Sequence, residues 1–97
     1  MGVRREVLYV DKGSSSNPAE RVLSIGGINA IGNTWKLSQQ QAIIGVDSET
    51  WEYFIKKGDK TLNIKVAQSS TGNKYLKTEE DGEQPENLLS LPDFPGN

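Results

Sequence analysis

The most regular pattern of hydrophobic and polar positions lies between residues 51 and 68. Apolar residues alternate with polar ones on both sides of Gly58 and Asp59, a pair typical of a two-residue turn between antiparallel strands. With this pair as the turn, Ile55 faces Leu62, and the apolar side chains gather on one face of the hairpin. That face carries Trp51, Tyr53, Ile55, Leu62, Ile64 and Val66. The pattern therefore predicts a hairpin with one buried face, and a slip of one residue would destroy this agreement.

A helix is indicated directly before this hairpin. Ser38, followed three residues later by Gln41, has the form of a capping box, in which each side chain satisfies a backbone N–H of the other residue. We expect Ser38 to be the N-cap and the helix to end near Asp47 or Ser48. Its glutamines, residues 39–41, are expected to face solvent. The apolar stripe toward the core would consist of Ala42, Ile43 and Val46.

The first 28 residues predict two further strands. Residues 3–12 are rich in β-branched and aromatic types, and a mobile loop is expected at 13–19, where serines, Asn and Pro accumulate. Residues 20–28 predict the second strand. Its Gly26 and Gly27 would allow a bulge or the close approach of another backbone.

One more strand is expected after the hairpin. If residues 69–73 form the loop, residues 74–78 return as a strand in which Leu76 faces Val66. A loop of four residues is the alternative and would change this pairing. The acidic segment 79–86 is too polar for a core and predicts a solvated turn, followed by a short helical turn.

Together these elements predict an α+β fold. One amphipathic helix would pack on a mainly antiparallel sheet of four to five strands, in the order strand, strand, helix and three strands. A chain of 97 residues fits a single domain over 1–97. Residues 96–97 are expected to fray at the C-terminus.

Composition excludes several classes of function. The chain has no Cys and no His, which removes thiolate nucleophiles, disulfides and the side chain best suited to proton transfer near neutral pH. We therefore expect a protein that is not an enzyme and holds no cofactor or metal. No apolar run approaches the roughly 20 residues that cross a bilayer, and no secretory signal is visible, so a cytoplasmic location is expected.

Two groups of residues are candidate binding sites. The first lies on the outer face of the predicted sheet, where basic side chains alternate with aromatic ones as in single-strand nucleic-acid platforms. It consists of Phe54, Lys56, Asn63, Lys65, Tyr75 and Lys77. The second is a polar group, Thr78, Asp81 and Asn87, which could line a small ligand site. Each of these three also has a structural interpretation: Thr78 ends the strand, Asp81 forms the turn and Asn87 caps the helical turn.

The acidic segment offers a third possibility. The carboxylates of residues 79–86 could gather around a hard cation such as calcium or magnesium. The segment lacks the spacing of a calcium-binding hand, and a solvated turn is the simpler interpretation.

Several short motifs point to a known family. They are Gly26-Gly27, Trp35 before the helix, Tyr75 to Thr78, Asp81-Gly82 and Asn87 to Pro92. In this combination, over about residues 21–94, the chain resembles a family of bacterial and archaeal proteins known as domain of unknown function 3892. The resemblance implies the limits of a family-like core, but no substrate, cofactor or catalytic residue.

The expected function is therefore binding. A net charge of −2 creates no general attraction for nucleic acid, so a small binding or accessory module with a protein partner is favoured. The alternative is binding of single-stranded nucleic acid or another anion through the outer sheet face. An enzyme ranks third.

Overall fold

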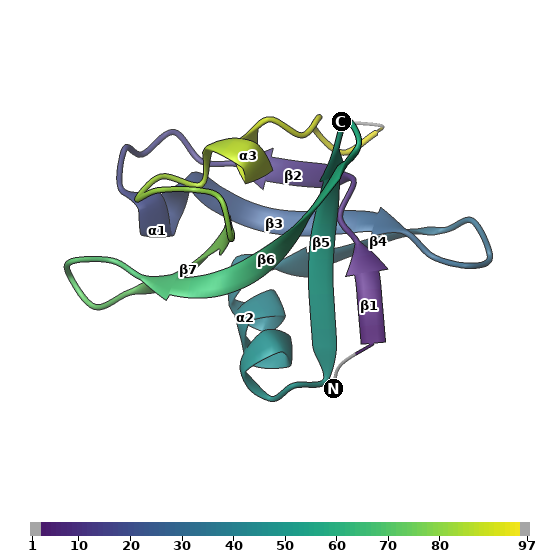
Figure 1. Ribbon diagram of the computed structural model, residues 1–97, viewed down its shortest axis with the longest axis horizontal. Coiled ribbons are helices and arrows are strands. Elements are labelled where there is room, and N and C mark those ends of the chain that lie inside the picture. The colour runs from purple at the N-terminus through teal and green to yellow at the C-terminus, as the bar shows by residue number, and fades with distance from the viewer. Residues whose placement is uncertain (1–2, 96–97) are drawn as a thin grey trace.

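The computed structural model describes residues 3–95, which form two sheets and three short helices (Figure 1). The larger sheet has the order β1-β5-β6-β7 and the smaller one β2-β3-β4. The strands are β1 (Val3–Glu6), β2 (Tyr9–Lys12), β3 (Val22–Ile28), β4 (Thr34–Ser38), β5 (Trp51–Lys57), β6 (Lys60–Gln68) and β7 (Lys74–Thr78). The helices are α1 (Pro18–Arg21), α2 (Gln39–Asp47) and α3 (Glu86–Leu89). The α+β class is confirmed, whereas the prediction of one helix on one sheet of four to five strands is wrong.

The hairpin prediction is confirmed. Ile55 faces Leu62 across β5 and β6, and Phe54 faces Asn63 on the opposite side. Val66 faces Leu76 across β6 and β7, so the connecting loop has five residues and not four. These pairings follow from the period of two, because only this register buries the apolar side chains together.

Residues 3–12 form two strands rather than one. β1 runs parallel to β5, with Arg5 opposite Tyr53, whereas β2 runs antiparallel to β3 in the other sheet. The chain changes sheets between them, where the backbone N–H of Val7 donates to Phe54 and that of Leu8 donates to Gly26. Residues 7–10 at this crossing are all apolar or aromatic, with Val7 and Val10 buried, so no polar turn separates β1 from β2 in the sequence. This is why residues 3–12 resemble a single strand.

The next segment also differs from expectation. The predicted loop 13–19 and the start of the predicted strand 20–28 contain α1, which begins after Asn17, whose side chain accepts a hydrogen bond from the N–H of Ala19. A missed strand, β4, pairs with β3. A Cβ on Gly26 would lie 2.3 Å from the carbonyl oxygen of Trp35 in β4, so the expected close backbone approach is confirmed at this glycine.

Helix α2 matches its prediction except on one face. Ser38 is the N-cap, the capping box with Gln41 is formed, and the helix ends at Asp47. Gln39 does not face solvent: its Oε1 accepts a hydrogen bond from the N–H of Leu76, and its Nε2 donates to the carbonyl of Ala19. This buried amide ties α2 to β7 and α1, which compensates for removing it from water.

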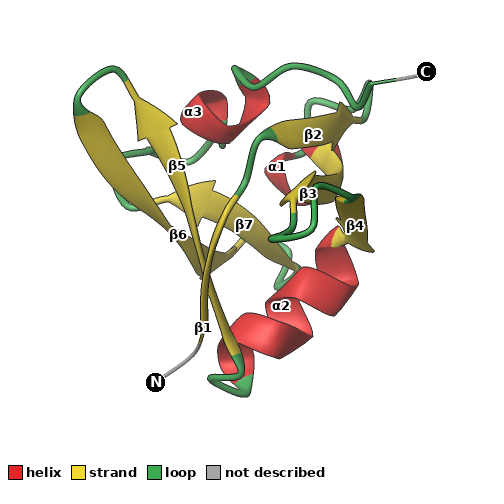
Figure 2. Cartoon of the chain, turned by 90° about the vertical axis from the view of Figure 1, so that its right-hand side faces the viewer, coloured by secondary structure: helices red, strands yellow, loops and turns green. Residues whose placement is uncertain are grey.

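The core lies between the two sheets and α2, which closes one end of the gap (Figure 2). It includes Val7, Val10, Val22, Ile25, Ala42, Ile43, Tyr53, Ile55, Leu62, Ile64, Leu76 and Leu88. Within residues 3–95, no helix is long and apolar enough to span a membrane. The expected fraying of residues 96–97 lies outside the described residues.

Candidate functional site

The outer face of the larger sheet does not present its aromatic residues to solvent. Phe54 is half-buried beneath the guanidinium of Arg4, whose carbon lies 4.7 Å from the ring centroid. The same guanidinium donates to Oδ1 of Asn63 at 3.1 Å. Only Lys56 and Lys65 are exposed lysines of the predicted group.

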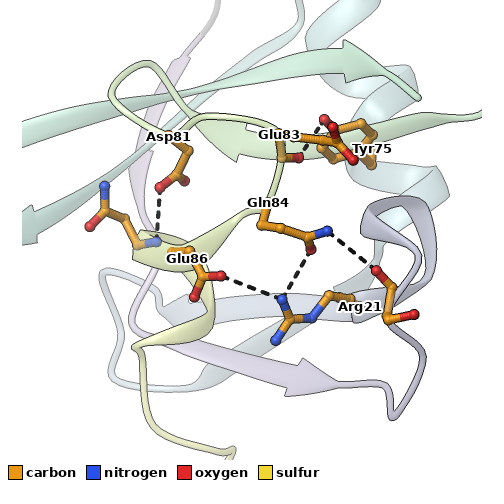
Figure 3. A network of polar contacts seen from close by, with 8 residues as sticks. Arg21, Tyr75, Asp81, Glu83, Gln84 and Glu86 are labelled. Carbon is orange, nitrogen blue, oxygen red and sulfur yellow. Dashed lines mark hydrogen bonds and ion pairs between the residues drawn. The ribbon is translucent and has the colours of Figure 1, made fainter. Parts of the chain in front are cut away.

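The prediction that Tyr75 lies on an open outer sheet face is wrong. Its side chain is buried, and its hydroxyl donates a hydrogen bond of 2.7 Å to the carbonyl of Glu83 (Figure 3). Lys77 lies opposite Lys65 as predicted, but its Nζ donates to the carbonyl of Gly82 at 2.7 Å. The segment after β7 therefore folds back over this part of the sheet, and the six predicted residues do not form one open platform.

The second predicted group is brought together by the structure. One oxygen of the Asp81 carboxylate accepts from the N–H of Thr78 and the other from the N–H of Asn87, each at 3.0 Å; Figure 3 shows the second bond. The Asn87 side chain donates to the Thr78 hydroxyl at 3.2 Å and accepts from Lys57 at 2.7 Å. Asn87 lies within α3 and does not cap it, so that part of the prediction is wrong. Because these polar groups satisfy one another, the arrangement favours a structural role.

The acidic segment is bound to neighbouring elements. Glu79 accepts from the N–H of Asn63, and Glu86 pairs with Arg21, which also donates to Gln84 (Figure 3). Among residues 3–95, no three or more Asp, Glu, His or Cys side chains are grouped so that they could hold a metal ion.

A cleft between β1 and the β3–β4 hairpin brings together residues that the sequence did not single out as a site. We call it the Arg5 cleft. It is lined by Val3, Arg4, Arg5, Glu6, Ile28, Asn29, Ala30, Trp35 and Trp51. Its volume is about 470 Å³. In Figure 1 the hairpin loop extends beyond β1 on the same side of the molecule.

The parallel pairing of β1 with β5 positions the cation of this cleft. It places Arg5 opposite Tyr53 and therefore on the core side of the sheet, next to two tryptophans. The guanidinium carbon lies 3.6 Å from the ring centroid of Trp51 and 5.1 Å from that of Trp35. Trp51 is held against Gly45 of α2, where a Cβ would approach its ring to 2.9 Å. The glycine within α2 thus makes room for one wall of the cleft.

Arg5 differs from its neighbour in its electrostatic environment. Arg4 pairs with Glu52 on the outer face, whereas Arg5 forms no ion pair or hydrogen bond through its side chain with another residue of 3–95. Stacking on indole rings stabilises a guanidinium but leaves the N–H groups at its edge free to donate. Arg5 can therefore bind a carboxylate or another planar anion with two parallel hydrogen bonds.

Tyr53 lies beneath the cleft, with its ring centroid 5.8 Å from that of Trp35. Its buried hydroxyl has no hydrogen-bond partner among residues 3–95. Burial raises the pKa of this hydroxyl above the ordinary 10.0, and the charge of Arg5 opposes part of the rise. As the pH rises past 10.0, Tyr53 ionises in the unfolded chain before it ionises in the folded chain. The free energy of unfolding therefore falls as the pH rises through this range.

Tyr53→Phe is therefore expected to leave stability at pH 7 unchanged or raise it by about 1 kcal/mol, because it removes an unsatisfied buried hydroxyl. It should also reduce the loss of stability at about pH 10.5. Tyr75→Phe removes a formed hydrogen bond and should cost about 0.5 to 1.5 kcal/mol at pH 7. Urea denaturation of both variants tests this, and equal losses at pH 7 would show that the two hydroxyls do not differ as described.

Sequence reasoning missed Arg5, Trp35 and Trp51 as a group. Trp51 was expected in the core and Trp35 was noted only as a family motif, while nothing linked either to Arg5. No local signal links them, because Arg5, Trp35 and Trp51 lie in three different strands. The meeting of Arg5 with Trp51 depends on a parallel pairing of segments 48 positions apart.

Comparison with known proteins shows which family the chain resembles. The family model described as a protein of unknown function (DUF3892) matches residues 6–92, nearly the whole chain. No curated protein and no solved structure matches the chain. The family resemblance seen in the sequence motifs is confirmed, and the match begins well before residue 21. The chain therefore belongs to the DUF3892 family of proteins of unknown function.

Proposed function

We propose that this protein is a protein-interaction module without enzymatic activity and that the Arg5 cleft is its contact surface. The observation that carries the proposal is the guanidinium of Arg5, stacked on Trp51 and without an ionic partner in residues 3–95. A cation held in place by aromatic rings is preorganised for a partner, because its position no longer has to be fixed on binding. Tryptophan and arginine are also the residues that dominate binding energy in protein interfaces.

Exposed apolar side chains at the cleft favour a protein partner. Val3 is 61% exposed and Ile28 is 49% exposed, and both line the cleft. Ile31, in the adjoining hairpin loop, is 80% exposed. Aromatic residues and Arg are enriched in protein interfaces, and exposed aliphatic side chains next to them fit a protein partner better than a nucleic acid, whose binding surfaces are dominated by positive charge.

The nucleic-acid alternative has less support. Lys56 and Lys65 leave some positive charge on the outer face, but Phe54 is covered by Arg4 and Tyr75 is buried. Base stacking, the main source of affinity in single-strand platforms, would thus lack an exposed ring there. An enzyme is disfavoured by the absence of His and Cys from the chain.

Two matched variants test the proposal. Ile28→Asp places a charge in the cleft, whereas Leu23→Asp places one at the other end of the same strand, at a residue that is 50% exposed. In affinity capture from cell extract followed by quantitative mass spectrometry, Ile28→Asp should reduce recovery of the specific partners by about tenfold or more, since a charge replaces an apolar contact. Leu23→Asp should retain them. Equal recovery with both variants, each checked by circular dichroism, would rule out the cleft as the contact surface.

A further inference from the structure

We propose that the Arg5 cleft binds a short extended peptide that adds as a strand to β1 and places a carboxylate on Arg5. This inference rests on the proposed function and names the chemistry of the partner.

The outer edge of β1 is open for such pairing. β1 is the first strand of its sheet, with β5 on one side only. The N–H groups of Val3 and Val7 donate toward β5, so those of Arg4 and Glu6 face away from it. Neither forms a hydrogen bond with another residue of 3–95. Backbone groups of this kind are the template for an added strand.

The opposite edge of the same sheet is closed by side chains. The N–H groups of Leu76 and Thr78 in β7 donate to Gln39 and Asp81, respectively. Side chains of residues 3–95 occupy the outer N–H groups of β7 but not those of β1. β1 is therefore the edge of this sheet that can accept an added strand.

The length of the added strand is limited by the neighbouring sheet. A Cβ on Gly27 would lie 2.5 Å from the carbonyl oxygen of Glu6, so the backbones of β1 and β3 already touch there. The open part of the edge lies at the Val3 to Arg5 end of the strand. A bound peptide would therefore pair over only two or three residues.

Side-chain alternation then gives the sequence preference of the peptide. Val3 and Arg5 occupy the same face of β1, opposite Trp51 and Tyr53. A peptide residue beside Arg5 would place its side chain at the free edge of the guanidinium, and a residue two positions away would lie beside Val3 and Ile28. Charge complementarity requires an acid at the first position, and the exposed apolar surface favours an aliphatic residue at the second.

A carboxylate fits this site better than a phosphate. One guanidinium is available. Arg4 also lines the cleft, but its guanidinium pairs with Glu52 and lies over Phe54 on the other face of the strand. A single arginine matches the one charge of a carboxylate through two parallel hydrogen bonds. The carboxylate can belong to a Glu side chain or to the end of a chain, and the test separates these sources.

The test uses the fluorescence of the chain's own tryptophans. The chain contains two, and both line the cleft. Three synthetic peptides are titrated into the full-length protein: acetyl-Thr-Val-Thr-Glu-Thr-amide, the same peptide with Gln in place of Glu, and the Gln peptide ending after Gln with a free carboxylate. We expect the Glu peptide to bind about tenfold or more tightly than the amidated Gln peptide, as for a charge-assisted pair. Preference for the free carboxylate would assign the same site to a chain end.

Variants of the two neighbouring arginines show where any preference arises. Arg5→Gln should bring the ratio of the Glu and Gln affinities close to one, and Arg5→Lys should restore it only in part. Arg4→Gln, a matched change on the other face of the strand, should leave the ratio unaltered. Equal binding of all three peptides to the natural protein, or loss of the preference with Arg4→Gln instead, would overturn the inference.

The failure of this inference can be told apart from failure of the proposed function. If Ile28→Asp abolishes partner recovery while the peptides show no preference, the cleft is a contact surface for a partner of another chemistry. If Ile28→Asp has no effect, the proposed function fails whatever the peptides show.

Discussion

Ile64→Ala is expected to lower the free energy of unfolding by about 2 to 5 kcal/mol, the range measured for truncating a large buried aliphatic side chain. Ile64 is 6% exposed and lies in the central part of β6, opposite Thr78 in β7. Truncation leaves a cavity between the larger sheet and the rest of the core, because neighbours in a close-packed interior relax only partly. Chemical denaturation followed by circular dichroism measures the loss.

Asn63→Ala is the matched control on the next residue. Asn63 is exposed, and its side chain accepts one hydrogen bond, from Arg4 on the surface. Its loss should cost no more than about 1 kcal/mol, since exposed side-chain hydrogen bonds contribute little net stability. A larger loss for Asn63→Ala than for Ile64→Ala would show that β6 presents the opposite face to the core.

Asp81→Ala is expected to cost about 2 to 4 kcal/mol, because it leaves two backbone N–H groups without their acceptor. One belongs to Thr78, which is fully buried, and the other to Asn87 in the first turn of α3. The carboxylate joins the end of β7 to α3, so its removal should also loosen the segment between them.

Asp81→Asn and Glu83→Ala complete this test. Asparagine retains one acceptor oxygen and should give an intermediate loss, whereas Glu83 has an exposed side chain and should be nearly silent on replacement. The same denaturation measurement applies. If Asp81→Ala lowered the free energy of unfolding no more than Glu83→Ala, the hydrogen bonds of Asp81 would not stabilise the fold. A ligand-binding role for Thr78, Asp81 and Asn87 would then be the better interpretation.

The elements that could be predicted are those whose pattern is local. Gly58 and Asp59 fix a turn, and the register follows because only one pairing puts Ile55 and Leu62 on the same buried face. The start of α2 was equally clear, because Ser38 and Gln41 satisfy each other's backbone within three residues.

The remaining elements depend on contacts between distant segments. Alternation places Tyr75 on one face of β7, but it cannot show that the segment around Glu83 folds over that face. The sequence places Gln39 on the solvent side of α2, because nothing local shows that the N–H of Leu76 in β7 donates to its side chain. The Arg5 cleft requires that residues 3–6 pair with β5 in parallel, and parallel partners leave no turn signal in the sequence.

Hydrogen–deuterium exchange of the chain, free and bound to the partner recovered by affinity capture, tests the central claim most directly. Binding at the Arg5 cleft predicts slower exchange at residues 3–7 and 28–35, with the amide of Arg4 most affected, because it points away from β5 at the open end of β1 and would become covered. Residues 54–56 and 63–65 on the outer sheet face should exchange as in the free chain. Slower exchange on that outer face, with residues 3–7 and 28–35 unchanged, would contradict the assignment of the cleft as the interaction surface.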